Sequence, residues 1–228
     1  MRFTFLLFVV FFGLNSVLAQ NQNRQFVKIE LTEQGAEIQV SDGKYVVALL
    51  SEHIIQSAFF PKGASEKMDS SHSVLLQAQV NPWELQEIQT EAVKEGKSKM
   101  YILKSGAVGV KIIIKPFDIS YFYKTTEVSE AQGFYFDQTP KIEFDLNAEE
   151  QLMGAGARVL GMNRRGYRLQ LYNRAHYGYE THSELMNFTM PIVLSDKGYA
   201  LHFDNPQIGW LDLDSKKQNK QFSQACND

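Results

Sequence analysis

The sequence predicts an all-β fold, a large two-layer antiparallel β-sandwich. Between Phe26 and Leu213 most segments are short and rich in Val, Ile, Phe and Tyr, and Gly, Ser, Asp or Pro separate them. The first set of residues favours strands, and the second favours turns. Antiparallel strands joined by short turns must bury one face on another sheet, so a sandwich is the economical architecture.

The N-terminal part of this region is expected to form hairpins. Residues 26–31 alternate, so the even-numbered side chains are expected on one face of a strand and the odd-numbered ones on the other. Further strands are expected at residues 36–40, 45–50 and 53–60.

Three successive strands are expected in the middle of the chain, at residues 99–103, 108–115 and 117–123, with Pro116 marking a break between the last two. Residues 125–132 are expected to form a polar connection. The β pattern then resumes at residues 134–136 and 142–146. A short helix is expected at residues 147–152, because an Asn is a good N-cap and acidic residues follow it in the first turn.

The first 19 residues have the form of a secretory signal peptide. Arg2 precedes an apolar run from Phe3 to Leu14, and small or branched residues lead to a cleavage point after Ala19. The run is shorter than the roughly 20 residues that span a bilayer, so the chain is expected to be exported and not membrane-spanning. Cys226 is the only cysteine, which excludes an intrachain disulfide and favours a bacterial periplasm, cell surface or extracellular location.

The charge of the chain disfavours nucleic acid as a partner. The net charge is −3 with 21% charged residues, and Lys and Arg are scattered along the sequence. The domain prediction is a signal peptide at 1–19, a β-sandwich at 20–213 and a polar, solvated tail at 214–228 that contains Lys216, Lys217 and Lys220.

The segment from Gln151 to Asn205 is the most informative part of the chain. Gly154 and Gly156 allow a tight turn or a close approach to another segment. The loop 173–182 concentrates aromatic rings, two imidazoles and a carboxylate, which suits a polar ligand with flat apolar faces. Residues 190–205 have the pattern of a hairpin about the turn 195–198.

This segment resembles the N-terminal domain of glycoside hydrolase family 31, which comprises α-glucosidases, α-xylosidases and related α-glucosyltransferases. The order and spacing of the motif residues carry the resemblance. The matching residues are Phe144, Leu146, Glu150, Gly154, Gly156, Arg158, 163–166, Asn173, 189–191, Ser195 and 198–205. Ala157, Ala175 and Ala200 depart from the usual pattern of the family.

The resemblance implies a galactose-mutarotase-like sandwich at the front of a larger enzyme. Family members carry their catalytic aspartates on a following (β/α)8 barrel, which alone needs about 250 residues. Retaining hydrolysis needs two carboxyl groups roughly 5 Å apart, and no such pair from a barrel is recognisable here. The resemblance therefore predicts no catalytic residue, no cofactor and no metal in this chain. Its implied partners are the missing barrel and, in the complete enzyme, an α-linked oligosaccharide with terminal glucosyl or xylosyl units.

Two groups of residues are predicted to act in the complete enzyme. The loop residues that are expected to contact substrate are Asn173, His176, Tyr177, Tyr179 and Glu180. The alternative for the two tyrosines is that they pack under the loop. The residues that are expected to contact the barrel are Arg158, Arg164 and Arg165. Local capping of strands is the alternative for Arg158.

Two other groups of residues raise the question of a metal site or a carbohydrate platform. The six-residue spacing of His176 and His182 is not one at which a helix or strand would bring both imidazoles to a single metal ion. Trp83 and Trp210 could each be a carbohydrate platform, or a core or interface residue. A free-standing carbohydrate-binding or assembly module, and an inactive truncated gene product, remain the alternatives to the enzyme-domain hypothesis.

Overall fold

A computed structural model describes residues 24–33, 35–64, 83–90, 98–130, 133–137, 139–173, 178, 188–204 and 207–225. This part of the chain contains strands and turns and no helix, and all of its strand pairs are antiparallel, which confirms the predicted fold class. None of the described segments is a helix long and apolar enough to cross a membrane. The expected signal peptide lies outside the described residues.

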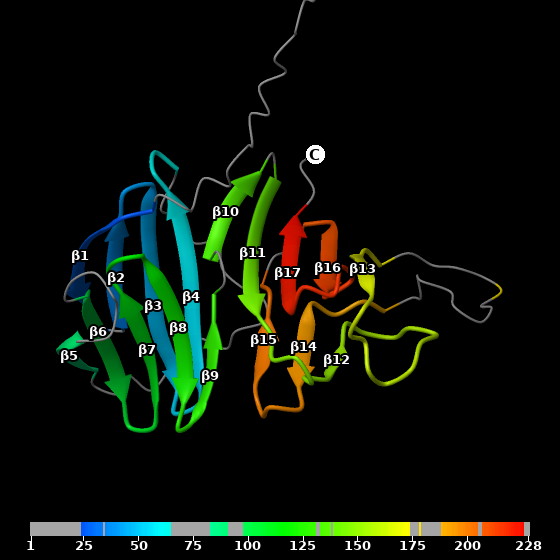
Figure 1. Cartoon of the computed structure of the whole chain (residues 1–228). Coiled ribbons are helices and arrows are strands. Elements are labelled where there is room, and N and C mark those ends of the chain that lie inside the picture. The colour runs from blue at the N-terminus through cyan, green and yellow to red at the C-terminus, as the bar shows by residue number, and fades with distance from the viewer. Residues whose placement is uncertain are drawn as a thin grey trace, which may run out of the picture.

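The N-terminal half consists of two sheets (Figure 1). Sheet A has the order β1-β2-β3-β4 and is formed by β1 (Phe26–Leu31), β2 (Gly35–Val40), β3 (Gly43–Ser51) and β4 (Ile54–Pro61). Sheet B has the order β5-β6-β7-β8-β9 and is formed by β5 (Glu84–Thr90), β6 (Ser98–Ser105), β7 (Val108–Ile113), β8 (Asp118–Tyr123) and β9 (Thr126–Ser129).

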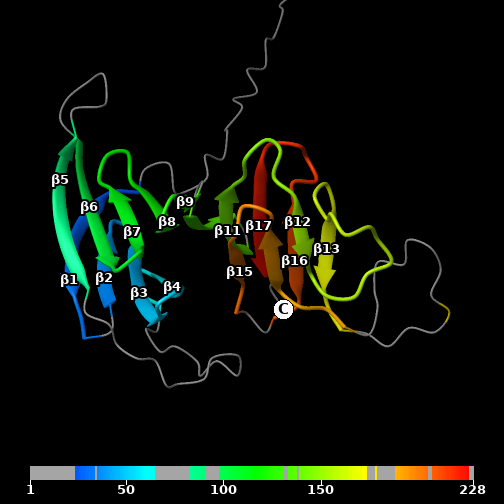
Figure 2. The same cartoon turned by 90° about the horizontal axis from the view of Figure 1, so that it is seen from below.

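The C-terminal half also consists of two sheets, on the other side of β9 (Figure 2). Sheet C has the order β10-β11-β17-β16-β13 and is formed by β10 (Gly133–Asp137), β11 (Thr139–Asp145), β13 (Arg168–Leu171), β16 (Gly209–Leu213) and β17 (Lys220–Ala225). Sheet D has the order β12-β14-β15 and is formed by β12 (Leu152–Gly154), β14 (Ile192–Ser195) and β15 (Ala200–His202).

Each half has its own hydrophobic core. Sheets A and B enclose a cluster that includes Ile38, Val47 and Ile112, each at most 1% exposed. Sheets C and D enclose another that includes Leu152 and Leu211, and Val128 of β9 belongs to this second cluster. Tyr121 packs against both clusters, so β8 and β9 join the two cores.

The alternation predicted for residues 26–31 is wrong. A bulge between Phe26 and Lys28 shifts the register against β2, because Phe26 pairs with Val40 while Lys28 pairs with Gln39. The extra residue reverses the side-chain alternation at that point. Phe26 and Ile29 therefore both pack against the core, and Val27 is 58% exposed.

Two local predictions in the middle of the chain are also wrong. Part of the expected polar connection, residues 126–129, pairs with β8 as strand β9. The expected helix at 147–152 is a single turn, in which the Glu150 N–H donates to the Asn147 carbonyl at 3.2 Å. The helix does not continue because Leu152 starts β12, which pairs with β14.

The predicted solvated tail is folded from Asp214 to Ala225. Strand β17 lies between β11 and β16, where Lys141 to Asp145 pair on one side and Gly209 to Leu213 on the other. Its sequence is polar, but it supplies the backbone partners of both neighbours, and Gln221 is fully buried. The sandwich therefore extends beyond Leu213.

Candidate functional site

The glycine-rich turn after β12 lies against the segment that leads into β14. Gly154, Ala155 and Gly156 have φ angles of 109°, 62° and 82°. The Ala155 N–H donates to the Ile192 carbonyl at 2.8 Å, and a Cβ on Gly156 would lie 2.5 Å from the carbonyl oxygen of Phe188. The turn needs glycine both for its backbone conformation and for this close approach, as the sequence predicts.

Asn173 holds the base of the predicted substrate loop together. Its Oδ1 accepts hydrogen bonds from the Thr189 N–H at 2.5 Å and from the Thr189 hydroxyl at 2.7 Å. The two segments that flank residues 174–188 are therefore clasped to each other. The other predicted loop residues, His176, Tyr177, Tyr179 and Glu180, lie outside the described residues, so their role stays a prediction.

Exposed apolar side chains surround this base. Phe188 is 50% exposed, Tyr172 38% and Met190 36%. The outer face of sheet D continues this surface, because Met153, Leu194 and Ala200 are register partners across its three strands and Leu194 is 46% exposed. We call Phe188, Met190, Met153, Leu194 and Ala200 the sheet D surface.

The three predicted interface arginines have different surroundings. Arg158 is buried and donates from Nη2 to the Gln170 carbonyl at 2.5 Å and from Nε to the Ala155 carbonyl at 3.3 Å, so it ties the glycine-rich turn to β13. Arg164 is 8% exposed, and its Nε and Nη1 have no hydrogen-bond partner in the described structure.

Arg165 is the centre of a local network. Its Nη1 donates to the carbonyls of Asn147 and Glu150 at 2.7 and 2.8 Å. Its Nε donates to Asp214 Oδ2 at 2.9 Å, and its Nη2 donates to Asn219 Oδ1 at 2.6 Å. The guanidinium thus joins the turn before β12 to the turn between β16 and β17. Contact of these arginines with another domain stays a prediction.

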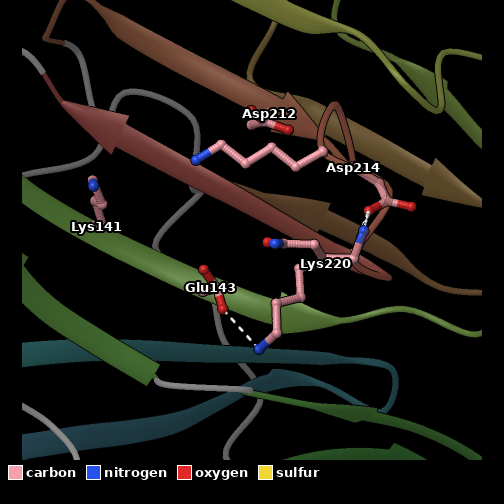
Figure 3. A pocket seen from close by; sticks show the side chains of 7 residues that line it. Lys141, Glu143, Asp212, Asp214 and Lys220 are labelled. Carbon is pink, nitrogen blue, oxygen red and sulfur yellow. Dashed lines mark hydrogen bonds and ion pairs between the residues drawn. The ribbon is translucent and has the colours of Figure 1, made fainter. Parts of the chain in front are cut away.

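A charged cleft of about 120 Å³ opens on the outer side of sheet C (Figure 3). Its lining residues come from β11, β16, β17 and the β16–β17 turn, and are Lys141, Glu143, Asp212, Asp214, Lys216, Gln218 and Lys220. Lys220 Nζ donates to Glu143 Oε1 at 2.9 Å, and Asp214 Oδ1 accepts from the N–H groups of Gln218 and Lys220. The carboxylates are held by neighbours within the domain, so the cleft is a structural ion-pair cluster.

The two tryptophans do not form an open platform. Trp83 is half-buried and packs against the core between sheets A and B. Trp210 is half-buried on β16, and the Arg168 guanidinium lies 4.8 Å from the centre of its ring. Among the residues that the structure describes, no group of three or more His, Cys, Asp or Glu side chains could hold a metal ion.

Several structurally important residues were missed by the sequence analysis. Glu150 is 2% exposed, and its Oε1 accepts hydrogen bonds from the hydroxyls of Ser195 and Tyr199, both at 2.5 Å. Thr189 and Asp214 also lacked a predicted role. The motif contains Glu150, Thr189 and Ser195, but their mutual contacts depend on the pairing of distant strands, which the spacing alone does not reveal.

Together, the antiparallel sheets and the two cores define the class of the protein as a galactose-mutarotase-like β-sandwich. The chain belongs to the glycosyl hydrolase 31 N-terminal galactose mutarotase-like domain family, which matches residues 12–212. This match confirms the resemblance to glycoside hydrolase family 31 that the motif residues indicated. A search of curated protein sequences gave no match.

Solved structures with a similar fold include family 31 enzymes. A dextranase from Flavobacterium johnsoniae, determined with isomaltotriose, is 18% identical with a TM-score of 0.74, and the match covers 88% of this chain and 25% of that chain. The cycloalternan-forming enzyme from Listeria monocytogenes, determined with a pentasaccharide substrate, is 13% identical with a TM-score of 0.70 and coverages of 90% and 20%.

An α-xylosidase from a soil metagenome, determined with xylose, is 13% identical with a TM-score of 0.62 and coverages of 87% and 30%. The chain therefore spans less than a third of the length of each of these proteins. At these identities the likeness establishes a shared fold.

Proposed function

We propose that this chain is the non-catalytic N-terminal β-sandwich of an exported family 31 α-glycosidase. In the complete enzyme it packs on a (β/α)8 barrel and lends the loop after Asn173 to the rim of the active site. The enzyme hydrolyses or transfers terminal α-linked glucosyl or xylosyl units. The observation that carries this proposal is the match of residues 12–212 to the N-terminal domain family, in a chain that spans at most 30% of the similar enzymes.

The sheet D surface supports a docking role. It is apolar and borders the clasped base of the loop, so a barrel that packed on it would lie beside that loop. Contiguous exposed apolar surface is uncommon on an isolated soluble domain and usually marks an interaction site. The saccharides in the similar enzymes, isomaltotriose and xylose, support α-glucosyl and xylosyl units as the substrate class.

The test begins at the source locus, which is sequenced through and beyond the codon for Asp228 in all frames. We expect it to encode a (β/α)8 barrel with a pair of catalytic aspartates. The chain with and without that barrel is then assayed on aryl α-glucoside and α-xyloside substrates. Activity is expected only when the barrel is present. Hydrolysis by the purified chain alone, or a locus without any barrel, would contradict the proposal.

Titration of the isolated chain with isomaltotriose separates the remaining alternatives. Saturable binding by a monodisperse chain without an encoded barrel would favour a free-standing carbohydrate-binding module. A chain that aggregates and whose locus carries only a broken barrel frame would favour an inactive truncated product.

A further inference from the structure

The two halves of the molecule are held together around Phe134 of β10. Arg24 Nη2 donates to the Phe134 carbonyl at 2.6 Å, and the Phe134 N–H donates to the Tyr45 hydroxyl at 3.3 Å. The Phe134 ring lies 5.1 Å from the ring of Phe59. Arg24, which precedes sheet A, and Tyr45 and Phe59 of sheet A thereby hold β10 of sheet C, and we call this set of contacts the junction.

Glu130 follows β9 in the chain, and its carboxyl group lies close enough to Tyr45 and Arg24 of the junction for both to lower its pKa. It is 2% exposed, and its backbone N–H donates to the Ile119 carbonyl at 3.0 Å. The Tyr121 hydroxyl lies 2.6 Å from Glu130 Oε1 and 2.7 Å from the Ser57 hydroxyl. Glu130 Oε2 is buried and has no hydrogen-bond partner in the described structure. A hydrogen-bonded chain thus runs from β4 through β8 to a carboxyl group that is only half satisfied.

The charged and titratable groups that face Glu130 come from several elements. Arg24, which precedes β1, forms an ion pair with Asp42 in the β2–β3 turn at 2.7 Å and donates to the Tyr45 hydroxyl at 2.6 Å. Burial raises the pKa of Glu130 to about 7, and the charge of Asp118 on β8 raises it as well. The hydroxyls of Tyr121 and Tyr45 and the charge of Arg24 lower this pKa.

We propose that Glu130 is a proton-operated latch between the two halves of the molecule. The Tyr121 hydroxyl has a single proton and two hydrogen-bond partners, Glu130 and Ser57. Which of the two accepts that proton depends on the charge of Glu130. When Glu130 is ionised, Ser57 donates to Tyr121 and Tyr121 donates to Glu130 Oε1. When Oε1 takes one proton from solvent, Glu130 donates to Tyr121, which then donates to Ser57.

The two states differ in how well they tolerate burial. The neutral acid leaves no net charge inside the junction. The anion keeps a negative charge there with one oxygen unpaired, which is costly in a buried site. The Tyr121 ring packs against both hydrophobic cores, so a strained hydrogen bond to Glu130 loosens the boundary between the halves. The halves therefore hold together more tightly when Glu130 is neutral, and the junction opens more often as the pH rises from about 4.5 to about 7. This latch is independent of the proposed enzymatic function.

The direct test is a carboxyl carbon NMR titration of the full chain labelled with carbon-13 glutamate, with the Glu130 signal assigned by its loss in Glu130→Gln. We expect a midpoint near the value of about 7. The Tyr121→Phe variant lacks the hydroxyl that stabilises the anion, so its midpoint should rise by about one unit. A midpoint near the ordinary value of 4.5, or no change in Tyr121→Phe, would overturn the latch.

Hydrogen exchange of the β10 amides gives the conformational readout. After correction for the intrinsic exchange rate, we expect opening to increase roughly tenfold or more between about pH 5 and about pH 8. The increase should shrink in Glu130→Gln, where only the part due to Asp118 remains, and should be unchanged in Glu30→Gln, which changes an exposed carboxylate. A pH dependence of the same size in Glu130→Gln and in the native chain would contradict the proposal. If Glu130→Gln does not fold, the Glu130 carboxyl signal is assigned as the one whose midpoint changes in Tyr121→Phe. The NMR titrations of Tyr121→Phe and of the native chain then test the proposal.

Discussion

At the scale of single residues, the clearest device in this protein is the use of glycine where two backbone segments touch. Gly156 has a φ of 82° and meets the carbonyl of Phe188, whereas Gly63 has nearly the same φ, 85°, with nothing within 4 Å of an added Cβ. The two glycines therefore separate the cost of the backbone conformation from the cost of a steric clash.

We expect Gly156→Ala to destabilise the domain more than Gly63→Ala. Gly63→Ala carries only the left-handed strain, about 1 kcal/mol, whereas Gly156→Ala adds the clash and should cost about 3 kcal/mol or more. Urea unfolding of both variants measures the difference. Equal losses would show that the segment at Phe188 moves away without cost.

Asp118 is a second residue with a defined pH dependence. Burial raises its pKa to about 6, and the charge of Asp145 raises it further while Lys111 lowers it. A pKa raised in the folded state means that the folded chain binds the proton more tightly. The resulting stability is fully present below the ordinary value of 3.8 and is lost as the pH rises through about 6.

We therefore expect Asp118→Asn to weaken the fall in unfolding free energy between about pH 4 and about pH 6. Urea unfolding at several pH values measures this slope, with Asp204→Asn as the exposed control. The same slope in native chain and Asp118→Asn would contradict the prediction. The pKa of Glu130 is raised from 4.5 to about 7, so Glu130 contributes to the fall in the same pH range and part of the slope is expected to remain.

At the scale of secondary-structure elements, β17 and the turn that precedes it organise the C-terminal half. The strand lies between β11 and β16, and the Asp214 carboxylate accepts from the Gln218 and Lys220 N–H groups to shape the turn. Arg165 holds the same carboxylate from the other side. One guanidinium therefore fixes the entry to the strand that completes sheet C.

Arg165→Lys should loosen this turn although it keeps the charge. An ammonium group cannot reproduce the planar fork that reaches two carbonyls and two side chains at once. We expect a loss of about 2 kcal/mol in unfolding free energy and faster hydrogen exchange at the Lys220 amide. Arg168→Lys on the outer side of sheet C is the control and should cost less. Equal effects of the two substitutions would argue against a central role of Arg165 in this network.

At the scale of the whole molecule, the exposed apolar side chains are unevenly placed. The sheet D surface is continuous across register partners and borders the clasped loop base. Leu31 has a similar exposure, 49%, but lies on the edge strand β1 of the other half. The pair Leu194 and Leu31 thus offers a matched comparison.

If the sheet D surface packs on a barrel, Leu194→Lys should impair the complete enzyme and Leu31→Lys should not. A charge at a buried apolar interface is costly, whereas at an exposed position it is tolerated. We expect Leu194→Lys to lower the melting temperature of the complete enzyme while it leaves the isolated chain unchanged or more soluble. A similar response to both substitutions in the complete enzyme would assign the barrel contact to another face.

Much of the fold could be predicted because most strands alternate or form short apolar runs between turn residues. The errors have physical causes. A bulge reverses the facing of side chains after Phe26, and the strand pairing of Leu152 prevents the helix that Asn147 and Glu150 favour locally. Strand β17 was missed because it is polar and gains its stability from backbone pairing on both sides.

The sequence by itself determined the fold class, the family and the need for glycine at positions 154 and 156, because these follow from local composition and motif spacing. Only the tertiary structure decided the rest. The hydrogen bonds of Asn173 with Thr189 and of Arg165 with Asp214 join residues that are separated in the sequence. The burial of Glu130 likewise depends on the packing of separate strands. Such contacts depend on which strands pair and in which register, and a linear pattern does not specify these long-range choices.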